Sequence, residues 1–234
     1  MGGSAMITST PRGPDPRYVR IFTEQPKKPR DWREQAERDC DRILYSSAFR
    51  RLEGVTQVVG AHEGSIFHNR LTHSHRVSQV ARRLAQKIVR QYSADVLTAV
   101  GGVDPDVAEA AGLAHDLGHP PFGHIAEQVL NKLLSDTYDD EEGFEGNAQS
   151  FRIVTKLARR APPPNGPGLN LTPATLNAIL KYPWPRERRD PGTRKFPDTK
   201  KARKWGFYRS EQNEFDEARK LPPTAGTELK SVEA

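Results

Sequence analysis

The 234-residue chain carries a formal net charge of +6, and only 35% of its residues are hydrophobic, so it is basic and short of core-forming side chains. No apolar run is long enough to span a membrane, the first residues lack the apolar centre of a signal peptide, and the single cysteine, Cys40, excludes an intramolecular disulfide. We therefore expect a cytoplasmic protein, whose charge reflects either a polyanionic partner, such as a nucleotide or a nucleic acid, or simply a solvated basic surface.

The two ends of the chain differ in composition from its middle. Residues 1–30 are rich in Pro, Gly, Ser and Thr, which is typical of a mobile N-terminal arm. Residues 31–182 contain enough Leu, Ile, Val, Phe and Ala to form a hydrophobic core. Residues 183–234 are basic, proline-rich and weakly periodic. The sequence thus predicts one helical core between two irregular segments.

Helical periodicity runs through the core, and strand patterns are nearly absent. Thr72, the Asp104–Pro105 pair and the Thr172–Pro173 pair supply the start signals of three helices. Helices are expected at about 31–51, 72–92, 105–116, 124–134, 147–160 and 173–182. Apolar spacing predicts that they bury Ile43, Leu44, Ala48, Phe49, Val77, Val80, Ala81, Leu84, Ile88, Ile125, Val129, Leu130, Phe151, Val154, Leu157, Leu176, Ile179 and Leu180. The pattern predicts an all-α fold with short connections between antiparallel helices.

The most informative stretch is AHDLGHPPFGHIAEQVL, at positions 114–130. Its adjacent His115 and Asp116 end a predicted helix, which Gly118 and two prolines stop. Neighbouring helical residues point about 100° apart, so two of them can serve one ion only where the backbone turns away. His73 lies on the inward face of the predicted 72–92 helix and supplies a third ligand. Three such ligands leave positions open for water and substrate, and the aspartate oxygen suits Mg²⁺ or Mn²⁺.

Other polar residues of this stretch suit acid–base chemistry. His124 and Glu127 are three positions apart and share a helical face, so the carboxylate can orient the imidazole as a proton donor. His119 lies between the two groups in the sequence. Each residue also has a plainer interpretation, because a lone inward histidine is more often a hydrogen-bonded core residue, and a first-turn acid is often solvated. The joint pattern favours a metal-dependent active site.

The residues around this site resemble the HD-domain phosphohydrolases, and more closely their deoxyguanosinetriphosphate triphosphohydrolase-like branch. The resemblance covers about residues 38–215, in the blocks RDCDRILYSSAFRRLEGVTQV, NRLTHSHRVSQVAR, LAHDLGHPPFGHIAEQVLN, GFEGNAQSFRIVTKL, GLNLTPATLNAILKYPW and YRSEQNEF. It implies an HD-domain helical bundle. It also implies hydrolysis of a dNTP, with dGTP the first candidate, to a deoxynucleoside and triphosphate.

The resemblance also implies roles for individual residues. It assigns His73, His115 and Asp116 to a divalent metal, Mg²⁺ or Mn²⁺, and assigns catalysis to His124 and Glu127. It further places substrate contacts at Arg70, Gln57, His119 and Asn147. A homo-oligomer, with a nucleotide effector or single-stranded nucleic acid as an additional partner, is typical of such proteins.

The end of the chain departs from the family pattern. The family's fourth metal ligand is an aspartate in a later segment like ADDIAY, which this sequence lacks, and the last residues, TELKSVEA, resemble the beginning of that helix. The sequence therefore suggests a C-terminally truncated member with impaired activity. Two alternatives stay open: an HD phosphohydrolase acting on another nucleotide, and an inactive module that binds nucleotides or single strands. The second would use Trp205, Phe207 and Tyr208 for stacking.

Overall fold

The structure is a computed structural model that describes residues 15–24, 31–55, 69–138, 141–159, 168–190, 192–193 and 195–220. Within these ranges the protein is all-α, as predicted, and the single β pairing is an isolated bridge between Pro185 and Phe207. None of the helices described there has the length and apolar character needed to cross a membrane. The helices are α1 (Gln35–Leu44), α2 (Ser47–Arg51), α3 (Arg70–Gln91), α4 (Ala94–Ala99), α5 (Pro105–Ala114), α6 (Gly123–Lys132), α7 (Gly146–Arg152), α8 (Pro173–Ile179), α9 (Lys200–Arg203) and α10 (Gln212–Arg219). Short turns of other helix types are η1 (Pro16–Tyr18), η2 (Leu52–Gly54), η3 (Leu133–Thr137), η4 (Ile153–Leu157) and η5 (Arg209–Glu211).

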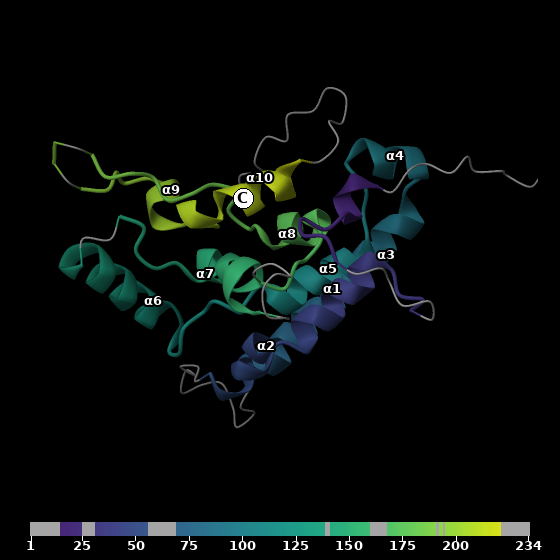
Figure 1. Cartoon of the computed structure of the whole chain (residues 1–234), viewed down its shortest axis with the longest axis horizontal. Coiled ribbons are helices and arrows are strands. Elements are labelled where there is room, and N and C mark those ends of the chain that lie inside the picture. The colour runs from purple at the N-terminus through teal and green to yellow at the C-terminus, as the bar shows by residue number, and fades with distance from the viewer. Residues whose placement is uncertain are drawn as a thin grey trace, which may run out of the picture.

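Helix α5 is the centre of the bundle and contacts α1, α3 and α8 (Figure 1). It begins where Asp104 caps its first turn, as predicted, and Pro105 follows the cap. Small residues allow α3 to approach closely, because a Cβ atom at Gly112 would lie 2.6 Å from the Cα of Ser78. This close packing places the N-terminal turn of α3 beside the C-terminal end of α5.

The long helix predicted at 31–51 is two helices. Helix α1 ends at Leu44, and the side chain of Ser46 accepts a hydrogen bond from the backbone N–H of Phe49 to start α2. Ile43 and Phe49 are buried in the core as expected. The apolar period continues across the break, which is why it did not reveal the cap at Ser46.

The N-cap of helix α3 lies three residues before the predicted one, because Asn69 rather than Thr72 accepts the capping hydrogen bond. Its predicted buried stripe is wrong in part. Val80 and Leu84 are 58% and 56% exposed, while serines and Ala85 form the buried side. The reason is that α5 covers the small-residue face of α3, not its most apolar one.

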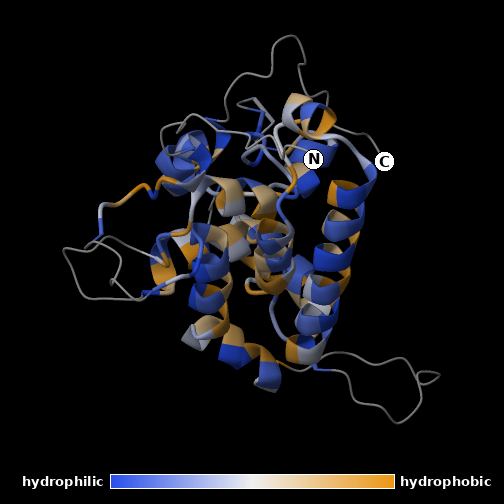
Figure 2. Ribbon diagram, turned by 90° about the vertical axis from the view of Figure 1, so that its right-hand side faces the viewer, coloured by the Kyte–Doolittle hydropathy of each residue, from blue (hydrophilic) through white to orange (hydrophobic). Residues whose placement is uncertain are grey.

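Helix α6 also turns its apolar side outward. Ile125 and Val129, predicted as core residues, are 65% and 61% exposed, and Glu127 is the buried residue of the helix. Figure 1 shows α6 at one edge of the molecule, away from α1 and α3. Hydrophobic ribbon segments accordingly occur on outer helices as well as in the middle of the bundle (Figure 2).

The helix predicted at 147–160 begins at Gly146 and ends in the π-turn η4. Phe151 and Val154 are buried as predicted, whereas Leu157 is 56% exposed. Helix α8 has the predicted cap at Thr172, and its residues Leu176 and Ile179 are buried.

The basic C-terminal segment contributes aromatic side chains to the core. Trp205 and Phe207 are fully buried and Tyr208 is 3% exposed, which contradicts the alternative in which they stack on nucleic-acid bases and also the alternative in which this part of the segment is a solvated loop. Phe207 instead stacks on Phe215 of α10 with ring centroids 4.1 Å apart.

The N-terminal segment also makes contacts within its described part, residues 15–24. Tyr18 donates a hydrogen bond to Asp104 at 2.7 Å, and Arg20 contacts Asp39 of α1 at 2.6 Å. This part of the predicted arm is therefore held against the bundle.

Candidate metal and catalytic site

The three predicted metal ligands converge at the junction of α3 and α5. His73 lies in the first turn of α3, and His115 and Asp116 directly follow the last residue of α5. One ligand atom from each residue lies within 4.8 Å of the others, and the two imidazole centroids are 5.3 Å apart. His73 is exposed and Asp116 is buried. The cluster therefore has an open side and a closed side, as a metal site that admits substrate requires.

Hydrogen bonding fixes the orientation of His115. Its Nδ1 atom lies 2.7 Å from the carbonyl oxygen of Gly112, and a carbonyl can only accept, so Nδ1–H is the donor. The other ring nitrogen, Nε2, is then free to bind a cation and lies 3.5 Å from Oδ1 of Asp116. A backbone carbonyl that fixes the tautomer of a histidine is a common support of metal ligands.

Asp116 is buried among positive and polar groups. Arg70 donates to its Oδ2 at 2.9 Å, and Nδ1 of His119 lies 3.3 Å from its Oδ1. Burial alone would raise the pKa of Asp116, but His115, His119 and Arg70 together lower it. The carboxylate is thus held in the ionised form that a divalent cation needs.

Arg70 and His119 also have unsatisfied buried atoms. Nε of Arg70 and Nδ1 of His119 have no hydrogen-bond partner among the described residues. Burial lowers the pKa of His119, which favours its neutral form. Buried polar atoms without partners indicate a place where a ligand or water completes the hydrogen bonding, so this part of the site can accommodate an additional polar group.

A tight turn connects the ligands to the neighbouring helices. Gly118 donates its backbone N–H to Ser150 Oγ at 2.9 Å, and that hydroxyl in turn contacts the carbonyl of His115 at 3.1 Å. A Cβ atom at position 118 would collide with the backbone at Ser150 and Gly146. Glycine at this position therefore lets α7 support the turn that carries the ligands.

His124 and Glu127 form the predicted pair on α6. Nδ1 of His124 lies 2.7 Å from Oε2 of Glu127, while the side chains are 72% and 5% exposed respectively. The His119 ring links this pair to the ligand cluster, because its centroid is 6.0 Å from that of His124. The ligand cluster and the pair form one continuous site.

Sequence reasoning missed two residues behind this pair. Nζ of Lys204 lies 2.8 Å from Oε1 of Glu127 and 3.1 Å from Oε1 of Glu145. Glu145 is the N-cap of α7, and Asn147, predicted to bind substrate, donates its side-chain amide to Glu145 at 2.8 Å. Lys204 had no distinguishing signal in a run of basic residues.

The predicted substrate residue Gln57 lies outside the described part of the chain.

The surroundings shift the pKa values of Glu127 and Glu145 in opposite directions. Burial would raise the pKa of Glu127, but hydrogen bonds from Lys204 and His124 lower it to about 2. Burial dominates at Glu145 and raises its pKa. The ammonium group of Lys204 therefore stabilises the charged form of Glu127 more than that of Glu145.

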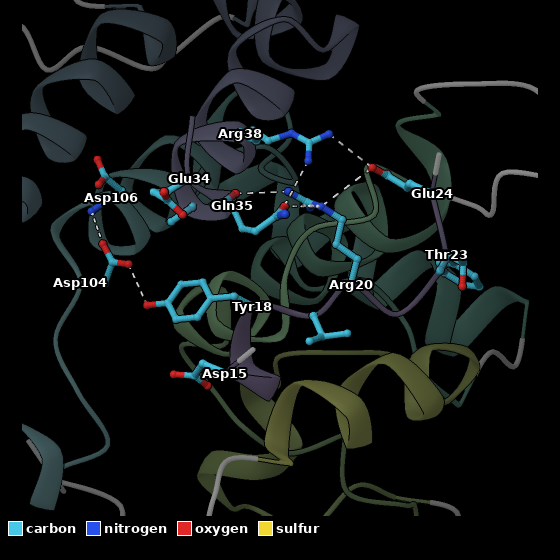
Figure 3. Close-up of a pocket in the computed structure, with 13 residues that line it drawn as sticks. Asp15, Tyr18, Arg20, Thr23, Glu24, Glu34, Gln35, Arg38, Asp104 and Asp106 are labelled. Carbon is cyan, nitrogen blue, oxygen red and sulfur yellow. Dashed lines mark hydrogen bonds and ion pairs between the residues drawn. The ribbon is translucent and has the colours of Figure 1, made fainter. Parts of the chain in front are cut away.

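A separate cavity of about 720 Å³ lies between residues 15–24 and the first turns of α1 and α5 (Figure 3). Its carboxylates already have partners: Asp104 accepts from Tyr18, and Glu24 accepts from Arg42 at 2.6 Å. The cavity lies at the N-terminal end of α5, whereas His115 follows the C-terminal end of that helix. It is therefore distinct from the candidate site.

Comparison with known proteins relates this chain to the HD-domain proteins. Residues 70–183 match the HD domain, a range that includes all three candidate ligands. The chain is 42% identical over 226 residues to a deoxyguanosinetriphosphate triphosphohydrolase-like protein of Streptomyces coelicolor, a match that covers 94% of this chain and 47% of the relative. Proteins of the same name in Bradyrhizobium sp. and Corynebacterium efficiens are 44% and 40% identical, over 74% and 81% of this chain and 39% and 40% of theirs. The chain spans about half the length, or less, of these relatives.

Proposed function

Because this chain belongs to the HD-domain family and is similar to deoxyguanosinetriphosphate triphosphohydrolase-like proteins, we propose that it is a metal-dependent phosphohydrolase that releases triphosphate from a dNTP. The observation that carries the proposal is the convergence of His73, His115 and Asp116 beside the His124–Glu127 pair. dGTP is the first substrate to test, because the relatives are named for it.

The residues of the cluster fit a divalent cation. Two imidazoles and an ionised carboxylate are ligands that Mn²⁺ and Mg²⁺ accept, and Mn²⁺ tolerates imidazole better. When bound, the cation would supply a Lewis acid at the α-phosphate. Arg70, beside Asp116, can offer its planar guanidinium to phosphate oxygens from the same side.

His124 is the proposed proton donor. With Nδ1 bonded to Glu127, its Nε2 is the ring nitrogen that can face a substrate, and the ring is largely exposed. Water attacks the α-phosphorus, the bond from that phosphorus to the 5′ oxygen breaks, and His124 gives its proton to the departing 5′ oxygen. A proton from the attacking water replaces the one that His124 has given. The Glu127 carboxylate stabilises the imidazolium before this transfer.

Product analysis tests the reaction. The chain is incubated with Mn²⁺ or Mg²⁺ and dGTP, and the products are separated by ion-exchange chromatography. Triphosphate and deoxyguanosine in equal amounts are expected. Orthophosphate or pyrophosphate would instead indicate an HD phosphohydrolase of another specificity, and nucleotide binding without turnover would indicate a binding module.

Metal binding has its own test, which needs no turnover. Calorimetric titration of the chelator-treated chain with Mn²⁺ should show one site, and the His115→Ala, Asp116→Ala double variant should lose it because two of three ligands are gone. His75→Ala, an exposed histidine of α3 outside the cluster, is the matched control and should bind as the wild type does. Unchanged Mn²⁺ binding in the double variant would contradict the ligand assignment.

The broader predictions belong to the same proposal. A homo-oligomer and a response to a nucleotide effector or single-stranded nucleic acid are expected from the resemblance, and a cytoplasmic location is expected from the sequence composition. The burial of Trp205, Phe207 and Tyr208 leaves basic side chains, not aromatic stacking, as the means by which this segment would contact a single strand.

A further inference from the structure

Lys204 reaches the candidate catalytic pair from a distant part of the chain. It follows α9 and lies 77 positions after Glu127. Its backbone is fixed on both sides, because its carbonyl accepts from Nε1 of Trp184 at 2.8 Å and the next residue, Trp205, is fully buried. The backbone of Lys204 is therefore held in place by its packed neighbours, and this position brings its side chain to Glu127.

The two carboxylates that meet this ammonium group depend on it to different extents. Glu145 is satisfied without it, since the backbone N–H groups of Asn147 and Ala148 donate to its Oε2 at 2.6 and 3.0 Å. Glu127 has less support of this kind, because apart from Lys204 and His124 its only partner among the described residues is the backbone N–H of Gly146, which donates to Oε1 at a long 3.3 Å. Within the described ranges Lys204 is the one lysine or arginine that contacts Glu127.

The charge of Glu127 decides where the proton between it and His124 resides. A carboxylate accepts a hydrogen bond from Nδ1–H, whereas a neutral carboxyl group donates its own proton to Nδ1. A buried carboxylate without a cation takes up a proton readily, because burial penalises the charged form. Loss of the ammonium group would therefore leave a proton on Glu127 and none on Nδ1 of His124, so that the neutral ring carries its single proton on Nε2. Without a carboxylate to stabilise the imidazolium, His124 would be less ready to take up and deliver a proton.

We propose that Lys204 is a positioning residue for the His124–Glu127 pair, which holds Glu127 as a carboxylate and so keeps the shared proton on Nδ1 of His124. Its consequence for catalysis rests on the proposed function. The location of the proton between His124 and Glu127 does not depend on the proposed function, because it follows from contacts that exist in the protein without substrate. His119 and Glu145 are the other titratable groups that face the pair, and neither supplies a fixed positive charge.

The test uses nitrogen NMR of the histidine rings in the free protein at neutral pH. The variants are Lys204→Met, which removes the charge, and Lys204→Arg, which keeps it. Lys200→Met is the matched control, because Lys200 is an exposed lysine at the start of α9, the short helix that Lys204 follows. The wild type, Lys204→Arg and Lys200→Met should show a protonated Nδ1 at His124, and Lys204→Met should show an unprotonated one.

A protonated Nδ1 in a folded Lys204→Met protein would overturn the proposal. Should that variant not fold, Lys204→Gln keeps a polar side chain of similar reach without the charge, and it is expected to lose the Nδ1 proton in the same way. Retention of the proton in folded Lys204→Gln would overturn the proposal equally.

Kinetics provide the catalytic readout where the wild type turns over dNTP. Lys204→Met should lower kcat by about 10- to 100-fold, the usual effect of removing a supporting group, with KM little changed. A change in KM alone would mean that Lys204 contacts substrate directly and would overturn the positioning role. Absence of triphosphate release by the wild type would count against the proposed function but would leave the NMR result to decide the role of Lys204.

Discussion

Two buried carboxylates of the candidate site, those of Asp116 and Glu127, each have a cationic side chain as a partner. Asp116 has Arg70 at 2.9 Å, and Glu127 has Lys204 at 2.8 Å. Each carboxylate is thereby kept ionised in a place where burial alone would favour protonation. At the scale of the residue, Asp116 and Glu127 are thus two buried anions that are each held by a cation from another segment of the chain.

Arg70→Lys should weaken dNTP binding even though the charge is kept. Lysine is a point donor and cannot hold both Asp116 and a phosphate oxygen as a planar guanidinium can. We expect the Kd to rise about tenfold, or ~1.4 kcal/mol, measured by calorimetry with a non-hydrolysable dGTP analogue. Arg83→Lys, on the exposed part of the same helix, should leave the Kd unchanged. Equal affinity in the Arg70→Lys variant and the wild type would argue against a phosphate contact.

Acid should destabilise the wild type through Glu127. Its pKa is lowered to about 2 in the folded protein, so the stabilisation is complete above the ordinary carboxyl pKa of 4.5 and disappears as the pH falls from there toward 2. Urea unfolding across this window should show the wild type losing roughly 1–3 kcal/mol more than Glu127→Gln, which cannot titrate. Parallel pH profiles for the two proteins would show that Glu127 is not held ionised.

At the scale of the element, the start of α7 supports the turn that carries the ligands. Ser150 bridges the N–H of Gly118 and the carbonyl of His115, and Gly146 lies directly beneath the imidazole of His119. The ligand positions therefore depend on close contact between backbones, which only glycine at position 118 permits.

Gly118→Ala should accordingly be strongly destabilising. The added methyl group would meet backbone atoms of α7, which cannot rotate away, so the turn or the helix must shift. Overpacking of this kind costs about 1–3 kcal/mol or more, measurable by urea denaturation, and Mn²⁺ affinity should fall with it. Gly54→Ala is the matched control, because nothing lies within 4 Å of its new Cβ. Similar stability of the two variants would show that the α7 contact is loose.

Local signals in the sequence predicted helix starts better than helix faces. Asp104 and Thr172 cap α5 and α8 as their side chains and following prolines indicated. At α3 the predicted cap, Thr72, is wrong: Asn69 accepts the capping hydrogen bond from the backbone N–H of Thr72, and the folded backbone decides which residue takes this role. Apolar spacing shows which face of a helix is apolar, but not what covers it, so the exposure of Val80 could not be predicted.

At the scale of the whole molecule, the ligand cluster was predictable and its supporting contacts were not. His115 and Asp116 are adjacent in sequence, and the position of His73 at a helix start brings it to them through one helix pair. The Lys204–Glu127 contact joins segments 77 residues apart, and its geometry depends on the packing of the whole C-terminal segment. No local pattern encodes such a pairing.

The exposed apolar side chains of α3 predict self-association. Val80 and Leu84 are one turn apart and more than half exposed, and Ile88 continues the row with 38% of its surface exposed. Contiguous apolar surface of this kind promotes contact between molecules. Sedimentation velocity over a concentration series should therefore show association of the wild type, reduced in the Val80→Lys, Leu84→Lys double variant.

The double variant should keep its stability within about 0.5 kcal/mol, because neither side chain is in the core. Added charge alone also discourages association, so the matched control is Gln79→Lys with Gln91→Lys, which adds the same two charges at exposed positions of α3 and removes no apolar surface. The control should associate more than the apolar-to-lysine variant does. Equal suppression by both pairs would assign the effect to net charge and not to the apolar row, and undiminished association of the Val80→Lys, Leu84→Lys protein would place the contact on another surface.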